Sequence, residues 1–144
     1  MRKRSVSLAA AAAGWLLLAA PAPLQAQAEQ QDVISGRCEY SDAVARYRFE
    51  TALILCDTVV ISRDGPDTVL DFKQRDWGSR ARVTGRMSGD TLSITEVALR
   101  DGQSAAATGT CKFFRHLDGR LSVIGCLAKR SSRSIAVNFV PSRV

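Results

Sequence analysis

The chain has 144 residues, of which 20 are basic and 14 acidic, with a single histidine and four cysteines. A chain of this length fits one domain and can bury a single core. Residues 1–28 hold three of the basic side chains and none of the acidic ones, which leaves 17 against 14 and a net charge of +3 in the rest. So small a charge argues against a nucleic-acid-binding protein.

The first 28 residues have the pattern of a secretory signal peptide. Basic residues at positions 2–4 precede an apolar run over residues 6–20, and an A-x-A motif ends at Ala28. The apolar run falls short of the roughly 20 residues that a membrane-spanning helix needs. We therefore expect Sec-type export, cleavage near Ala28, and a single periplasmic or secreted domain of residues 29–144 that does not span the membrane.

The mature part contains all four cysteines: Cys38, Cys56, Cys111 and Cys126. An even number of cysteines in an exported chain predicts a disulfide framework, here two bridges. The sequence has no C-x-x-C pair, and its only histidine is His116, so the ligand set of a structural zinc site is missing. We expect neither a metal nor another cofactor.

Apolar and polar residues alternate with a period of two through the mature chain, and no long stretch has helical spacing. Turn signals that contain glycine separate the alternating runs at short intervals. We therefore expect an all-β domain, a small antiparallel β-barrel or β-sandwich of about 8–9 short strands arranged mostly as a meander. The expected strands are residues 33–41, 44–50, 52–62, 67–74, 80–87, 90–99, 105–117, 120–128 and 134–140.

An Asp-Gly dipeptide at residues 118–119 predicts a β-hairpin. Asp-Gly favours a two-residue type I′ loop, in which both loop residues have positive φ. A hairpin centred there places Cys111 directly opposite Cys126. Opposed Cα atoms in an antiparallel ladder lie about 4.5–5.5 Å apart, within the disulfide range of about 4.4–6.8 Å. We predict a Cys111–Cys126 bridge, which leaves Cys38 to pair with Cys56.

A second hairpin is expected around the Gly-Asp pair at residues 89–90. This loop would place Met87 opposite Leu92, both apolar. Continuing the same register would bring Glu96 onto the apolar face. One extra residue within 95–97 would restore the apolar face, so we predict a β-bulge there.

Three arginines form a candidate binding surface. If Ala81 and Val83 point inward, then Arg80, Arg82 and Arg86 share the outward face of one strand. Guanidinium groups bind carboxylates and phosphates, so this row could meet lipopolysaccharide, a peptidoglycan carboxylate or an acidic protein patch. A solvated strand face without a ligand is the simpler interpretation.

Two loops contain further candidate binding residues. Trp77, in the loop of residues 75–78, could be an exposed recognition anchor or could fold back to plug one end of a barrel, and we favour plugging. A basic turn contains Lys129, Arg130 and Arg133. We interpret this turn as a hairpin tip that its charges keep in water.

The sequence favours a binding protein over an enzyme. His116 and nearby Asp118 show no sign of the three groups in series that a Ser–His–Asp site requires, so we expect no enzymatic activity. We predict a periplasmic interaction or inhibitor-type module that binds an envelope protein or an anionic envelope polymer through loops and arginines. A small hydrolase remains as one alternative. The other is a carrier with a lipocalin-like cavity, lined by Ala105, Ala106, Ala107, Gly109 and Gly125.

In size, export signal and two predicted disulfides, the chain resembles the small β-barrel inhibitors of lysozyme found in bacterial envelopes. The resemblance is one of architecture and carries no residue role to this chain. Because a fold hosts many functions, it implies a small exported barrel and leaves the partner open.

Overall fold

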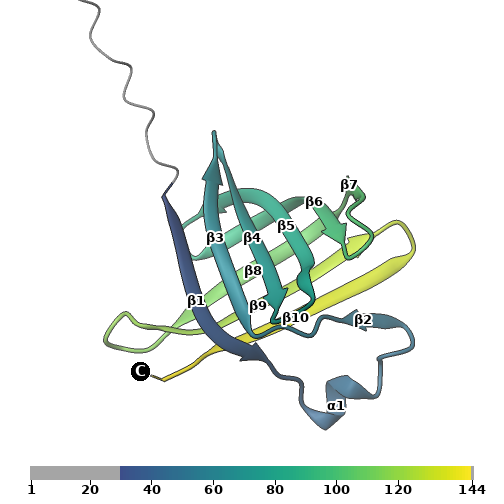
Figure 1. Ribbon diagram of the computed structural model, residues 1–144, viewed down its shortest axis with the longest axis horizontal. Helices are drawn as coiled ribbons and strands as arrows, with labels where there is room; N and C mark the ends of the chain where they lie inside the picture. Colours follow the sequence, from purple (N-terminus) through teal and green to yellow (C-terminus); the bar gives the residue numbers. More distant parts are fainter. Residues whose placement is uncertain (1–29, 144) are drawn as a thin grey trace, which may run out of the picture.

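The computed structural model describes residues 30–143, which form a closed antiparallel β-barrel (Figure 1). Eight strands follow one another around the barrel in chain order, and the first pairs with the last. They are β1 (Gln31–Cys38), β3 (Thr58–Asp64), β4 (Asp67–Gln74), β5 (Gly78–Ser88), β6 (Thr91–Leu99), β8 (Thr108–Arg115), β9 (Leu121–Arg130) and β10 (Arg133–Pro141). The predicted all-β meander is confirmed, and it closes as a barrel.

Two short strands and one helix are added to the barrel. Strand β2 (Thr51–Leu53) runs parallel to β10, β7 (Ser104–Ala106) pairs with β6, and α1 (Asp42–Ala45) lies between β1 and β2. The prediction of a strand over residues 44–50 is wrong. The Ser41 side chain caps α1 by accepting a hydrogen bond from a backbone N–H of its first turn, and turns follow the helix.

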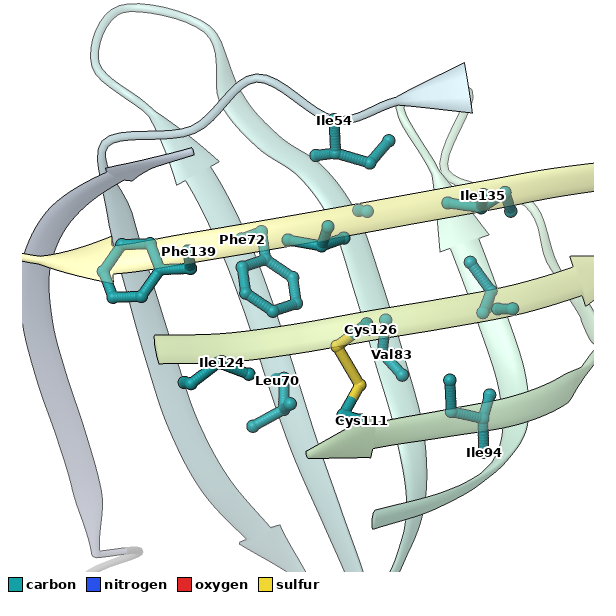
Figure 2. Close-up of a cluster of buried hydrophobic side chains, with 14 of the residues drawn as sticks. Ile54, Leu70, Phe72, Val83, Ile94, Cys111, Ile124, Cys126, Ile135 and Phe139 are labelled. Carbon is teal, nitrogen blue, oxygen red and sulfur yellow. A yellow bond between two sulfur atoms is a disulfide. The ribbon is translucent and has the colours of Figure 1, made fainter. Parts of the chain in front are cut away.

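The predicted strand 52–62 is divided into β2 and β3. The segment between them is not a strand, and it carries Ile54 and Cys56 into the core, as Figure 2 shows for Ile54. Cys56 is bonded to Cys38 at the end of β1, which confirms the second predicted bridge. Within the part of the chain that the structure describes, no helix is both long and apolar enough to cross a membrane.

Inward-facing side chains fill the barrel (Figure 2). The rings of Phe72 and Phe139 lie 6.4 Å apart between centroids, and Leu70 and Ile124 are also fully buried. Eight strands enclose an interior just wide enough for side chains to fill. Of the five small residues proposed as the lining of a carrier cavity, only Ala107 is buried, and the other four are at least partly exposed.

The predicted Cys111–Cys126 bridge is confirmed, and it joins directly opposed residues of β8 and β9 whose Cα atoms are 4.0 Å apart. The predicted loop type is wrong. Hydrogen bonds across the turn leave a loop of three residues, 117–119, with positive φ only at Gly119 (84°). A bulge at Ser122 then adds one residue to β9. The extra residue in the loop and the extra residue in β9 compensate for each other. Cys111 and Cys126 are therefore directly opposite, as they would be with a two-residue loop and no bulge.

The predicted bulge in the β5–β6 hairpin is confirmed. Gly85 pairs with Ile94 and Thr84 pairs with Glu96, which leaves Thr95 as the extra residue. The Thr95 hydroxyl donates a hydrogen bond to the Thr84 carbonyl at 3.2 Å. The bulge keeps the apolar side chains of both strands on the inner face.

Candidate functional site

Two of the predicted site arginines lie close to carboxylates of the neighbouring strand. Arg82 Nη2 is 3.6 Å from Asp71 Oδ2, and Arg86 Nε is 3.5 Å from Asp67 Oδ1. Both guanidinium groups are mostly solvent-exposed, so each pair adds little stability. The carboxylates nevertheless neutralise these two charges locally, and this part of β5 is not a purely basic surface.

Asp71 is buried, and its partners come from β4 and from β5. The Ser79 hydroxyl donates to Asp71 Oδ1 at 2.6 Å, and Lys73 Nζ lies 3.6 Å from Oδ2. Because a buried carboxylate is costly unless it is paired and hydrogen-bonded, these contacts have a structural role. Arg82 belongs to this cluster.

Arg80 is placed differently from Arg82 and Arg86. Phe72 pairs with Ala81 and Lys73 pairs with Ser79, which leaves Arg80 as the extra residue of a bulge between β4 and β5. A bulge re-aims the side chain at its position. Arg80 therefore lines a cavity at the end of the barrel, separate from the pairs described above.

This cavity, which we call the arginine cavity, has a volume of about 170 Å³. Three arginines line it, each from a different part of the barrel: Arg80 from β5, Arg100 just after β6 and Arg133 at the start of β10. No acidic residue lines it, and the rest of its wall is Ala52, Leu53, Ile54, Leu55 and Leu99. Among residues 30–143, the arginines found in ion pairs are Arg37, Arg82, Arg86, Arg115 and Arg120.

Trp77 lies next to the arginine cavity and is 58% exposed, so the favoured interpretation of Trp77 as a plug is wrong. Its indole ring packs against the Arg100 guanidinium, whose carbon is 4.9 Å from the ring centroid. Such a cation–π contact is worth about 0.5–1 kcal/mol at an exposed site. Positive φ at Asp76 (68°) and Gly78 (69°) shapes the turn that presents the ring. Trp77 thus restrains one of the three arginines.

The carboxylate of Asp57 contacts the β4–β5 turn and accepts hydrogen bonds from two donors. Asp57 Oδ2 accepts a hydrogen bond from the Arg75 backbone N–H at 2.7 Å, and Oδ1 accepts one from the Thr58 hydroxyl at 2.9 Å. The Arg75 hydrogen bond, followed by that from Thr58, lowers the pKa of Asp57 below its usual value. Asp57 therefore fixes the turn and does not neutralise the arginine cavity.

A larger hollow lies on the outer face of β8, β9 and β10, and we call it the Gly125 groove. Its volume is about 530 Å³. Apolar walls come from Tyr40, Val44, Phe114 and Leu127, and polar groups come from Glu39, Thr110, Lys112 and Asn138. This groove could not be predicted from the sequence, because its walls come from segments that are distant in the chain.

The residues considered for hydrolysis, His116 and Asp118, lie at or next to the β8–β9 turn. His116 is exposed near the β8–β9 turn. Both Asp118 oxygens accept hydrogen bonds from Arg120, from the backbone N–H at 3.0 Å and from Nε at 2.6 Å. These bonds lower the pKa of Asp118. Within residues 30–143, no three His, Cys, Asp or Glu side chains gather into a possible metal site.

Sequence reasoning identified Arg80 and Trp77 but missed Arg100 and placed Arg133 in a solvated turn. The positions of Arg100 and Arg133 next to the ends of predicted strands could have identified both residues. Arg100 directly follows the predicted strand 90–99, and Arg133 directly precedes the predicted strand 134–140. In an up-and-down barrel, the end of one strand and the start of a strand of opposite direction lie at the same end.

Comparisons with protein-family models, with curated proteins and with solved structures each found no match to this chain. Function is therefore inferred from the residues and their placement. Two surfaces stand out: the arginine cavity beside Trp77 and the Gly125 groove on the outside of the barrel.

Proposed function

We propose that this chain is an exported, non-enzymatic binding module that recognises an anionic group of an envelope component through the arginine cavity and Trp77. The observation that supports this is the lining of the cavity: three arginines line it and no acidic residue does. Like charges around a small concave surface raise the local positive potential and attract anions.

The chemistry of arginine fits this role. A guanidinium group presents a planar set of donors that matches carboxylate and phosphate oxygens. Trp77 adds an exposed aromatic surface at the rim, and Trp and Arg are enriched in binding hot spots. The packed interior offers no support for the carrier alternative, which requires a cavity inside the barrel.

The proposed location is the periplasm or the cell exterior, after removal of the leader near Ala28. The leader pattern lies outside the described residues and is supported by the sequence alone. The two disulfides support the same location, because such bonds persist in oxidising compartments.

Co-sedimentation of the purified oxidised protein with peptidoglycan sacculi and with lipopolysaccharide tests the proposal. The test variant carries Arg80→Gln, Arg100→Gln and Arg133→Gln together. The matched control carries Arg37→Gln, Arg86→Gln and Arg120→Gln, an equal change of charge at arginines that already pair with carboxylates. We expect the test variant to lose at least about 10-fold in affinity for one ligand and the control to keep most of it. Equal losses in both variants would indicate binding by net charge and refute the proposal.

A further inference from the structure

A further cavity opens at the end of the barrel opposite the arginine cavity, where β1 and β4 begin and β3, β5 and β8 end (Figure 1). We call it the mouth cavity. Its volume is about 300 Å³, which is the lower end of the range for small-molecule sites, roughly 300–1,000 Å³. Six of the residues that line it are Asp32, Ile61, Arg63, Thr68, Met87 and Phe113.

The strand register places the polar residues of the mouth cavity on the inner face of the barrel. Directly opposed residues of antiparallel strands share one face of the sheet. Asp32 pairs with Ile61, and Ile61 pairs with the fully buried Leu70. Arg63 lies two residues beyond Ile61, on the same face, and pairs with Thr68. Asp32 and Arg63 are therefore diagonal neighbours, with Cα atoms about 7–8 Å apart.

Asp32 and Arg63 bring opposite charges to the same cavity without pairing. Within residues 30–143, neither side chain is part of an ion pair. The cavity is also lined by Arg115, but its guanidinium group already pairs with Asp90, with Nε 2.9 Å from Oδ1. The mouth cavity thus presents one carboxylate and one guanidinium group that remain to be matched. A ligand with both charges close together satisfies both.

The Thr68 hydroxyl is a third polar group at the mouth cavity. The residue is only 5% exposed, and none of the side-chain hydrogen bonds within residues 30–143 involves its hydroxyl. The same part of the chain contains no fully buried polar side-chain atom without a partner. The hydroxyl of Thr68 is therefore open to the mouth cavity that this residue lines. Because a buried hydroxyl without a partner is costly, a ligand oxygen is a favourable acceptor there.

The remaining wall of the mouth cavity is apolar. Ile61, Met87 and Phe113 line it, and Phe113 is 8% exposed. The flexible thioether side chain of Met87 can adjust to the shape of a ligand. The barrel interior is filled with side chains, so a ligand is confined to the mouth. Its charged groups and its apolar part must then lie within a few atoms of each other.

We propose that the mouth cavity binds a free α-amino acid with an apolar side chain. The Asp32 carboxylate accepts hydrogen bonds from the ammonium group, and the Arg63 guanidinium donates to the carboxylate. The Thr68 hydroxyl donates to a second carboxylate oxygen, and the apolar side chain packs on Met87 and Phe113. This site is separate from the arginine cavity, and it selects a zwitterion where the arginine cavity selects an anion.

An NMR titration of the oxidised mature protein with L-methionine, up to about 20 mM, tests the inference through the backbone amide resonances. Three further compounds each lack one feature. N-acetyl-L-methionine lacks the ammonium group, L-methionine methyl ester lacks the carboxylate, and glycine lacks the apolar side chain. We expect L-methionine to shift the resonances of Asp32, Arg63 and Thr68 with a dissociation constant at or below about 1 mM. Each of the other compounds should bind at least about 10-fold more weakly.

Two variants assign the charges. Asp32→Asn and Arg63→Gln should each weaken L-methionine binding by at least about 10-fold. Asp32→Asn should also bind L-methionine and its N-acetyl derivative within about 2-fold of each other, because the group that distinguishes them is gone. The controls are Glu50→Gln and Arg86→Gln, which remove the same charges outside the mouth cavity and should change binding by less than about 2-fold.

The absence of a saturable shift at the mouth cavity overturns the inference, and so does binding of the N-acetyl derivative or the ester as tight as that of L-methionine. Circular dichroism shows whether each variant is folded, and the compound series on the wild type decides the question if a variant is not. The variant with Arg80, Arg100 and Arg133 replaced by glutamine should bind L-methionine as the wild type does. Loss of binding in that variant would place the ligand in the arginine cavity and overturn the inference.

Discussion

Alkaline pH should weaken the fold through Tyr40, and Tyr40→Phe should remove that pH dependence. Burial raises the pKa of Tyr40 to about 12, against a partial opposing effect of backbone hydrogen bonds at Asn138 and Ile54. The tyrosine of an unfolded chain titrates near 10. Between these two values, the folded chain holds a proton that the unfolded chain has lost.

The sign and size of the effect follow from proton linkage. Because the folded state binds more protons over this range, the free energy of unfolding falls as pH rises. The Tyr40 contribution is fully present below pH 10 and is lost as pH rises through 12. A shift of about two pKa units corresponds to about 2.7 kcal/mol. The ring is partly solvent-accessible, and screening reduces the expected loss to about 1–2 kcal/mol.

Urea unfolding of the oxidised wild type and of Tyr40→Phe, from about pH 8 to about pH 12, measures the difference in free energy. No free thiol is present to start disulfide exchange. At the lower pH, the variant should be less stable by about 0.5–1.5 kcal/mol, the value of the lost hydrogen bonding. This gap should close or reverse at the higher pH. A gap that stays constant across the range would refute the reasoning.

Three further predictions concern stability. Replacing both Cys111 and Cys126 by alanine should lower the free energy of unfolding by about 3 kcal/mol, the chain-entropy value for a loop of about 15 residues; an unchanged urea midpoint would contradict this. Gly125→Ala should raise it by about 0.5–1 kcal/mol, since the Cβ fits and the unfolded chain loses freedom. Gly85→Ala should lower it by more than about 1 kcal/mol, because its Cβ would overlap the Ser93 carbonyl. A higher melting temperature for Gly85→Ala than for Gly125→Ala would contradict at least one of these two expectations.

The hairpins could be predicted from sequence because their pairing is local. The Cys111–Cys126 register depends on about a dozen residues around one turn. The alternation of apolar residues limits the errors in this register, because a shift by one residue would turn apolar side chains outward. The bulge at Thr95 follows from the same alternation, since Glu96 would otherwise face the core. The three-residue length of the β8–β9 loop could not be predicted from the alternation of apolar residues. The bulge at Ser122 compensates for the extra loop residue and leaves the apolar pattern unchanged.

The segment between β1 and β3 was predicted poorly because its structure depends on distant contacts. Ile54 and Cys56 alternate as they would in a strand, yet they lie between β2 and β3, outside any strand, with their side chains in the core. Strand β2 pairs with β10, which is about 80 residues away in the chain. The short helix α1 had one local signal, the N-cap at Ser41.

The candidate site was only partly predictable for a related reason. Trp77 and Arg80 are neighbours in sequence, and their chemistry identified them. Arg100 and Arg133 join them only once the barrel closes. Which arginines already have carboxylate partners, as Arg82 does, depends on strand register and side-chain conformation, and alternation alone does not specify these.

The most direct test of the central claim is an NMR titration of the oxidised mature protein with inorganic pyrophosphate, observing the arginine Nε–H and tryptophan indole resonances. We predict that the resonances of Arg80, Arg100, Arg133 and Trp77 shift together along one saturating curve, while those of Arg86 stay in place. No saturable shift at the arginine cavity, or equal shifts at Arg86, would contradict it.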